Sequence, residues 1–207
     1  MISGITLRTI SLFSALLFAY AAHAAPPPAA QTADSNSKCY SPYSSSKDHM
    51  ITGCEIPGYR MHSDIAQQAG ILMVLLPEGF SDLDKAPVFF MVNTLELGDG
   101  DVQSLFTADL KTMLADKPKI KVTDHTVSEK PKKMGTCVGA RLKLPAGEHF
   151  PYELYYICKN KSSKYAIQIG LQARTEDLLR KHKSRFLKWA DIPQLVVDAK
   201  VIDPMKP

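Results

Sequence analysis

The residues of this chain with the most definite chemistry are its four cysteines, Cys39, Cys54, Cys137 and Cys158. They form no C-x-x-C pair, and no histidine stands beside them in a known catalytic motif, which disfavours a redox-active or nucleophilic thiol. An even number of cysteines in an exported chain usually forms disulfides, and residues 1–24 carry an export pattern described below. Four cysteines allow three pairings, so their spacing has to select among them.

The stretch "CVGARLKLPAGEHFPYELYYIC", from 137 to 158, favours one pairing. A two-stranded antiparallel ribbon that reverses near its centre places Cys137 opposite Cys158, close enough for a disulfide. The cysteines then lie on one face, and the other face carries Val138, Ala140, Leu142, Tyr155 and Ile157. Cys39 would pair with Cys54. A bulge in the turn would shift this register, and links from Cys39 to Cys137 or Cys158 are the alternatives.

Other residue types that bind metals or catalyse reactions are dispersed. The histidines that follow residue 24 show no spacing that would direct two rings at one metal: His49, His62, His125, His149 and His182. The stretch that begins at Asp99 and Asp101 resembles a calcium loop, but Ser104 and Leu110 occupy the positions of its obligatory Gly and Glu. No nucleophile elbow, phosphate loop or dinucleotide fingerprint is present. We therefore predict no metal, no cofactor and no catalytic residue, and favour a protein that is not an enzyme.

The densest basic run, "RKHKSRFLK" at 180–188, is a candidate binding surface. On a helix, Arg180, Lys181 and Lys188 point away from the apolar face that contains His182, which we interpret as a core histidine. Such a basic face can contact anionic lipid headgroups or an acidic partner. An ordinary solvated helix face is the alternative interpretation.

Tyrosines near lysines suggest a second candidate surface. Tyr152 and Tyr156 lie close in sequence to several lysines, and aromatic side chains beside basic ones recur at interfaces. Tyrosine is also a common strand residue, so packing in the core is the alternative for both.

The N-terminal residues predict export. Residues 1–24 contain Arg8, an apolar run too short to span a membrane, and a final Ala-His-Ala that matches a cleavage site for a secretory signal. Residues 25–38 are rich in Pro, Ala and Ser and predict a flexible leader. The net charge of +4 includes Arg8 and would fall to +3 after cleavage, too small to indicate nucleic-acid binding. Residues 39–207 are expected to form a single domain without a transmembrane segment.

Hydrophobic patterning predicts a mixed α and β domain. Continuous apolar runs at 71–76 and 88–92 predict strands that are covered on both faces. Alternation predicts further strands at 119–127 and 165–173, and the second of these carries Ala166, Gln168, Gly170 and Gln172 on one face. Helices are expected after the N-cap residues Asp101 and Thr175, and a short helix or strand is expected to close the chain.

This order of elements, together with "GILMVLLPEGF" at 70–80, resembles the PsbP-like α/β/α sandwich. Photosystem-associated PsbP, Ran-binding Mog proteins and periplasmic proteins of the DcrB type share that fold. The resemblance covers residues 70–202, but it accounts neither for the cysteine pairs nor for the arm from Cys39 to Arg60. It implies a mainly antiparallel sheet flanked by helices and a role in binding or assembly, and it carries over no functional residue.

The function we expect is therefore that of an exported, disulfide-stabilised α+β protein in the periplasm or outside the cell. Its predicted role is non-enzymatic binding or envelope assembly, with a protein as the expected partner. Two alternatives stay open. One is a hydrolase or redox enzyme of the cell envelope whose site residues are dispersed, and the other is a secreted factor that binds a host or competitor target.

Overall fold

A computed structural model describes residues 31–33, 37–40, 49–97, 100–124, 129–159 and 165–197. The predicted signal at 1–24, His125, Asp99 and the last ten residues lie outside these ranges. No helix in the described part of the chain has the length and apolar composition needed to cross a membrane.

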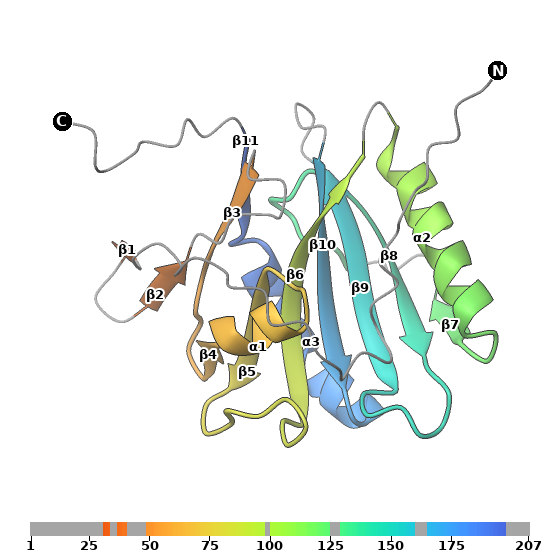
Figure 1. The fold of residues 1–207 in the computed structure, drawn as a ribbon, viewed down its shortest axis with the longest axis horizontal. Helices are drawn as coiled ribbons and strands as arrows, with labels where there is room; N and C mark the ends of the chain where they lie inside the picture. Colours follow the sequence, from red (N-terminus) through yellow and green to blue (C-terminus); the bar gives the residue numbers. More distant parts are fainter. Residues whose placement is uncertain are drawn as a thin grey trace.

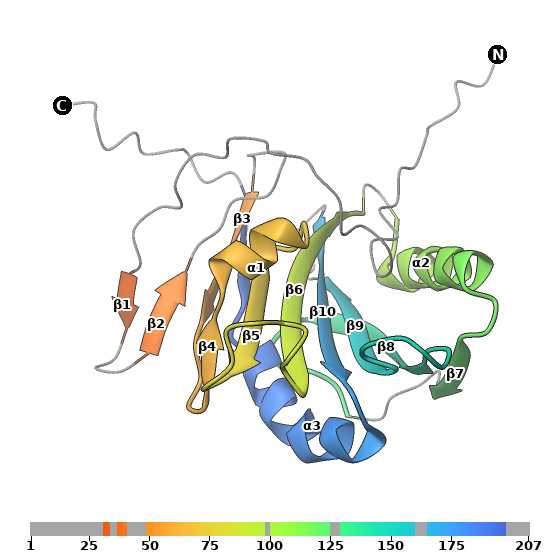
Figure 2. The same cartoon turned by 60° about the horizontal axis from the view of Figure 1, so that its bottom comes forward.

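The domain is built on a seven-stranded antiparallel sheet with the order β4-β5-β6-β10-β9-β8-β7 (Figure 1). Its strands are β4 (Tyr59–Met61), β5 (Met73–Pro77), β6 (Val88–Glu96), β7 (Lys121–Asp124), β8 (Thr136–Lys143), β9 (Tyr152–Lys159) and β10 (Tyr165–Ala173). Helices α1 (Ser63–Gln68) and α2 (Val102–Asp116) lie on one face, and α3 (Glu176–Ala190) lies on the other (Figure 2). The predicted fold class is confirmed.

Both faces of the central strands are buried, as the continuous apolar runs predicted. On β6, Phe90 and Val92 pack in the cluster that α3 covers, while Phe89 and Met91 pack beneath α1. The alternation of β10 is confirmed in the same way, because Ile167, Ile169 and Leu171 face α3 and Ala166 lies in the α2 cluster.

Helix α3 covers its face of the sheet with aromatic side chains. The ring centroids of Phe186 and Trp189 lie 5.4 and 5.5 Å from that of Phe90. Thr175 caps the helix by accepting a hydrogen bond from the Leu178 amide, and Asp101 caps α2 by accepting one from the Ser104 amide. Both predicted N-caps are confirmed.

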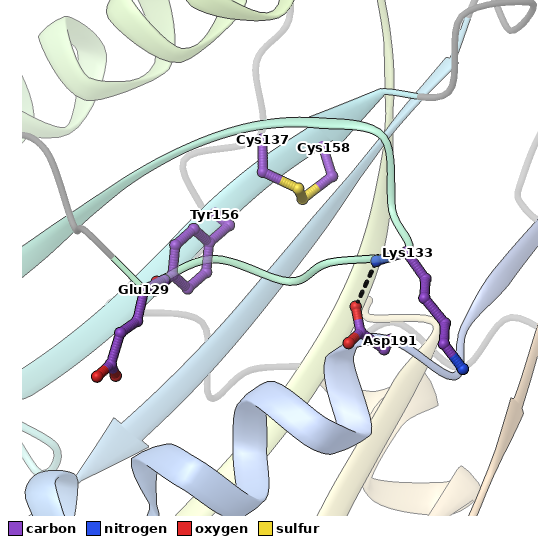
Figure 3. The surroundings of a disulfide bond; sticks show 6 residues. All are labelled: Glu129, Lys133, Cys137, Tyr156, Cys158 and Asp191. Carbon is purple, nitrogen blue, oxygen red and sulfur yellow. Dashed lines mark hydrogen bonds between the residues drawn. A yellow bond between two sulfur atoms is a disulfide. The ribbon is translucent and has the colours of Figure 1, made fainter.

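The hairpin of β8 and β9 has the predicted register. Cys137 lies opposite Cys158, and the two form a disulfide on the α3 side of the sheet. The segment before β8 crosses this region beside the disulfide (Figure 3), where the Tyr156 hydroxyl donates a hydrogen bond to the Glu129 carbonyl at 2.6 Å. The Lys133 amide donates one to Asp191 at 2.8 Å, which ties the segment to the end of α3.

A smaller sheet forms beside the main one in the order β1-β2-β3-β11. It contains β1 (Gln31–Ala33), β2 (Ser37–Tyr40), β3 (His49–Cys54) and β11 (Gln194–Val197). The second predicted disulfide, Cys39–Cys54, joins β2 to β3, and Trp189 Nε1 donates a hydrogen bond to the Cys54 carbonyl from α3.

Three elements add to what the sequence indicated. β1 and the start of β2 fall within residues 25–38, the segment expected to be a flexible leader, and the two strands pair with each other. The closing element, left open as helix or strand, is a strand because it pairs with β3. Helix α1 was not predicted, since six residues are too few to show a clear helical period.

Candidate functional site

The predicted basic surface lies on the outer side of α3. Arg180, Lys181 and Lys188 are exposed, as the helical pattern requires. Arg180 is paired with Asp177 at 2.6 Å, one turn earlier on the helix. Part of the positive charge of this face is therefore balanced within α3 itself.

Neither of the two predicted tyrosines is exposed as the basic residues of α3 are. Tyr152 is half-buried, with the Lys143 ammonium 5.4 Å from its ring centroid. Tyr156 is fully buried and packs in the core under α3, so its assignment to a binding surface is corrected. It points inward because it shares a strand face with Leu154 and Cys158.

His182, expected in the core, is partly buried at the junction of α3 and the main sheet. Its Nδ1 forms a hydrogen bond with the Tyr59 hydroxyl, which joins α3 to β4 at the edge of the main sheet. Burial first, and then the positive charges of Lys181 and Arg185, lower the pKa of His182, so the neutral ring is favoured. The sequence interpretation as a structural histidine is consistent with this geometry.

A different group of residues has unusual chemistry. Among the side chains that the structure describes, four buried polar atoms reach no hydrogen-bond partner. One is His62 Nε2, and the others are Asp109 Oδ2, Tyr155 OH and Gln172 Nε2. The last three residues surround Glu153, and we call Asp109, Glu153, Tyr155 and Gln172 the interhelix polar site.

Strand pairing brings three of these residues together. Glu153 on β9 lies directly opposite Gln172 on β10, in a row that continues to Leu142 on β8 and Phe89 on β6. Leu142 belongs to the apolar cluster beneath α2, and Phe89 belongs to the one beneath α1. Glu153 and Gln172 therefore occupy the boundary between the two helices.

The next row on the same face contains Tyr155, Gly170 and Met91. A Cβ atom on Gly170 would lie 3.1 Å from Met91 Cγ and 3.9 Å from Glu153 Oε1. The absence of a side chain there lets Met91 and the Glu153 carboxyl approach each other over β10. Gln168 and Asn93, paired in the following row and both partly exposed, continue the polar boundary.

Helix α2 supplies the fourth member. Phe106 stacks on Tyr155 with a centroid separation of 5.2 Å, and Phe106 and Leu110 are buried against the sheet. Asp109 lies between these two positions on the helix and is only partly buried. Its carboxyl is close enough to the sheet to raise the pKa of both Glu153 and Tyr155.

Burial dominates the electrostatics of the interhelix polar site. It raises the pKa of Asp109 to about 6. It also raises the pKa of Glu153 to about 7, an increase that the Gln172 side chain and Lys117 oppose and the charge of Asp109 reinforces. Glu153 is 4% exposed, Gln172 5% and Tyr155 1%.

The neighbouring charges belong to an ion pair at the end of α2. Lys117, the C-cap residue, places its Nζ 2.6 Å from the Glu148 carboxyl in the β8–β9 turn, and both side chains are partly exposed. The Lys117 ammonium therefore lowers the pKa of Glu153 from a distance, while it forms an ion pair with Glu148.

Chemically, the site offers hydrogen-bond donors and acceptors on a rigid sheet, with two carboxyls that titrate near neutrality. It can bind a small polar group or exchange protons with one. Within the described ranges, no three His, Cys, Asp or Glu side chains are grouped so that they could hold a metal.

Sequence reasoning missed the interhelix polar site. The alternation of 165–173 placed Gln168, Gly170 and Gln172 on one strand face, and three residues without apolar side chains on a buried strand were the available signal. Glu153 gave a similar signal within an otherwise apolar strand. Nothing in the sequence of α2 indicated that Asp109 would meet them.

Comparison with known proteins identifies a similar fold and no sequence family. No protein-family pattern matches the chain, and no curated protein is similar in sequence. The solution structure of cyanobacterial PsbP from Synechocystis sp. PCC 6803 superposes with a TM-score of 0.47 at 12% identity, over 76% of this chain and 92% of that protein.

Two structures of Mog1 are also similar. A mutant of the protein Mog1 gives a TM-score of 0.44 at 13% identity, over 78% of this chain and 97% of that one. The Ran-binding protein Mog1p of Saccharomyces cerevisiae gives 0.40 at 14% identity, over 73% and 84%. The chain therefore resembles PsbP and Mog1 in structure, as its order of elements predicted, while its sequence matches no known family.

Proposed function

We propose that this protein is an exported, non-enzymatic binding protein whose ligand site is the interhelix polar site. The observation that carries the proposal is the convergence of three unpartnered buried polar atoms, on Asp109, Tyr155 and Gln172, around the buried carboxyl of Glu153. Each such atom costs about 1–3 kcal/mol when no partner replaces water. A ligand that supplies the partners would recover that cost.

A purely structural role explains this arrangement less well. The same rows of the sheet are filled on either side by apolar residues such as Leu142 and Phe89, which bury area without unpaired polar groups. Sites built for polar ligands combine an apolar frame with a few convergent polar side chains. The boundary between α1 and α2 has that composition.

The proposed location rests on covalent and sequence features. Both cysteine pairs form disulfides, which persist in oxidising compartments. The export pattern of residues 1–24 supports the periplasm or the extracellular space. Within that setting, Arg180, Lys181 and Lys188 are the proposed contact surface for a protein partner in the envelope or outside the cell.

The binding proposal is tested by screening the oxidised protein against small polar molecules by thermal shift and calorimetry. The variants Asp109→Asn and Tyr155→Phe are expected to weaken binding of any true ligand. Asp116→Asn, which changes an exposed carboxylate on the same helix, is the matched control. A ligand that binds all four proteins equally would contradict the assignment of the site.

The partner surface is tested separately by cross-linking in cells. Reversal of charge with Lys181→Glu and Lys188→Glu is expected to abolish capture of a partner while the protein stays folded. Capture that is unchanged in this variant would contradict the role of the α3 face.

An enzymatic function is the second candidate, and the paired carboxyls favour it. One acid and one base with pKa values near neutrality can transfer protons in hydrolysis. A turnover that disappears in Glu153→Gln, while ligand binding is retained, would replace the binding proposal with this one.

A further inference from the structure

We propose that the interhelix polar site recognises a protonated amine that carries a neighbouring hydroxyl or carbonyl oxygen, as in an amino alcohol or an amino-acid amide. This inference rests on the proposed binding function and adds the chemical class of the ligand. It follows from the charges and from the hydrogen-bonding groups of the site, taken in turn.

The charges call for a cation. Asp109 and Glu153 place two carboxyls in a buried region, where an ionised group is costly unless it is paired. Lys117 acts on Glu153, but its Nζ is 2.6 Å from Glu148 and shares its charge with that carboxyl. A ligand ammonium would allow both carboxyls to ionise, because an opposite charge within about 4–6 Å favours the charged form. An anionic ligand would meet repulsion instead.

The hydrogen-bonding groups match the same ligand. An ammonium has three donors, and Asp109 Oδ2 and the Tyr155 hydroxyl are unpartnered groups that can accept from it. An ionised Glu153 supplies a third acceptor. Gln172 Nε2 acts on the Glu153 carboxyl but forms no hydrogen bond of ordinary geometry, and an oxygen beside the ligand's amine would give it a better acceptor.

A divalent metal ion fits this set less well. Calcium takes six to eight oxygen ligands and magnesium requires a near-octahedral shell. The interhelix polar site offers two carboxylates, a neutral phenol and an amide whose unpartnered atom is a nitrogen donor. Its chemistry therefore favours an ammonium, which is bound by a few charge-assisted hydrogen bonds.

The orientation of the ligand follows from which members are exposed. Asp109 is only partly buried, and Gln168 and Asn93 continue the polar boundary towards solvent along β10 and β6. Glu153, Tyr155 and Gln172 lie deeper. Asp109 is therefore the member nearest to solvent, and a ligand amine would meet it before Glu153.

The test is calorimetric titration with three amine probes: ethanolamine and serinamide, which carry an oxygen, and putrescine, which does not. Ethylene glycol and glycolate serve as the neutral and anionic counterparts. Titrations are run between the two carboxyl pKa values, about 6 and about 7, in two buffers that differ in ionisation enthalpy. We expect the amines with an oxygen to bind and to release protons into the buffer, because binding ionises the carboxyls. Glu153→Gln should weaken binding at least about tenfold and reduce the proton release, and Asp116→Asn should change neither.

The outcomes separate the two proposals. Binding of glycol or glycolate that is lost in Tyr155→Phe would keep the proposed function and overturn the amine. Amine binding without proton release would also overturn the amine as the ligand class. So would binding of Ca²⁺ or Mg²⁺ that releases protons and is tighter than the binding of every amine. Failure of all the amine probes to bind at millimolar concentration counts against the amine, and equal binding by Asp109→Asn and Tyr155→Phe would overturn both proposals. If Glu153→Gln does not fold, Asp109→Asn carries the same comparison.

Discussion

Glu153 and Gln172 face each other across β9 and β10 in the middle of a sheet whose neighbouring positions are apolar. Both side chains are almost completely buried, and the Gln172 amide acts on the Glu153 carboxyl without a hydrogen bond of ordinary geometry. This relationship links the fold to the proposed function, because antiparallel pairing fixes the two groups in place before any ligand arrives. It also makes the stability of the domain depend on the protonation of Glu153.

The first prediction concerns pH. The pKa of Glu153 rises from 4.5 to about 7 in the folded protein, and that of Asp109 from 3.8 to about 6, mainly through burial. The folded state therefore binds more protons than the unfolded state between these limits. The stability from the protonated carboxyls is fully present below their ordinary pKa values and is lost as the pH rises through about 6 to 7. We expect the Tm to fall from pH 5 to pH 8, by roughly 2–4 °C per kcal/mol lost.

The measurement is thermal unfolding followed by circular dichroism across this pH range. Glu153→Gln should be more stable than the parent at pH 8 and should show a flatter dependence. A parent Tm that rises through this range, with no difference in the variant, would contradict the burial of Glu153.

The second prediction concerns His182 and has the opposite sign. The pKa of this histidine is lowered in the folded protein, so its contribution is present above the ordinary pKa of about 6.5 and is lost as the pH falls. Tyr59→Phe removes the hydrogen bond to His182 and should lower stability by about 0.5–1.5 kcal/mol. Denaturant unfolding at pH 7.5 and pH 5.5 measures both effects. If stability changes between pH 7.5 and pH 5.5 by the same amount in His182→Gln as in the parent protein, the ring has no structural role.

The third prediction concerns the disulfides. Peptide mapping without reduction should find Cys137 linked to Cys158 and Cys39 linked to Cys54. Replacement of Cys137 and Cys158 by Ala should cost about 2–4 kcal/mol, because the unfolded chain gains freedom. A peptide that joins Cys39 to Cys137 or Cys158 would show that the hairpin register is incorrect.

The fourth prediction concerns Gly139 on β8. A Cβ atom there would lie 2.3 Å from Tyr156 Cδ1 and 2.6 Å from the Tyr155 carbonyl oxygen. Because the second contact is with backbone, Gly139→Ala should force the β8–β9 pair to shift and should destabilise the domain by about 1–3 kcal/mol. Thr136→Ala, at an exposed position on the same strand, is the control and should stay within about 0.5 kcal/mol. Urea unfolding of both variants measures these changes in the free energy of unfolding.

Local chemistry determined much of this protein's framework. The turn midway between Cys137 and Cys158 set the hairpin register, and with it one disulfide and by elimination the other. Strict alternation in β10 and the N-caps Asp101 and Thr175 placed their elements correctly, since each signal acts over only a few residues. The order of these elements was enough to indicate the resemblance to PsbP and Mog1.

Tertiary structure alone decided the rest. β11 became a strand through pairing with β3, a distant partner that no local pattern encodes. Tyr156 turned into the core because its strand face packs under α3. Asp109 and Glu153, which are far apart in the chain, meet only because α2 lies across β8 and β9. Burial of their carboxyls is a property of that packing, so the polar residues of β9 and β10 gave a signal in the sequence while Asp109 gave none.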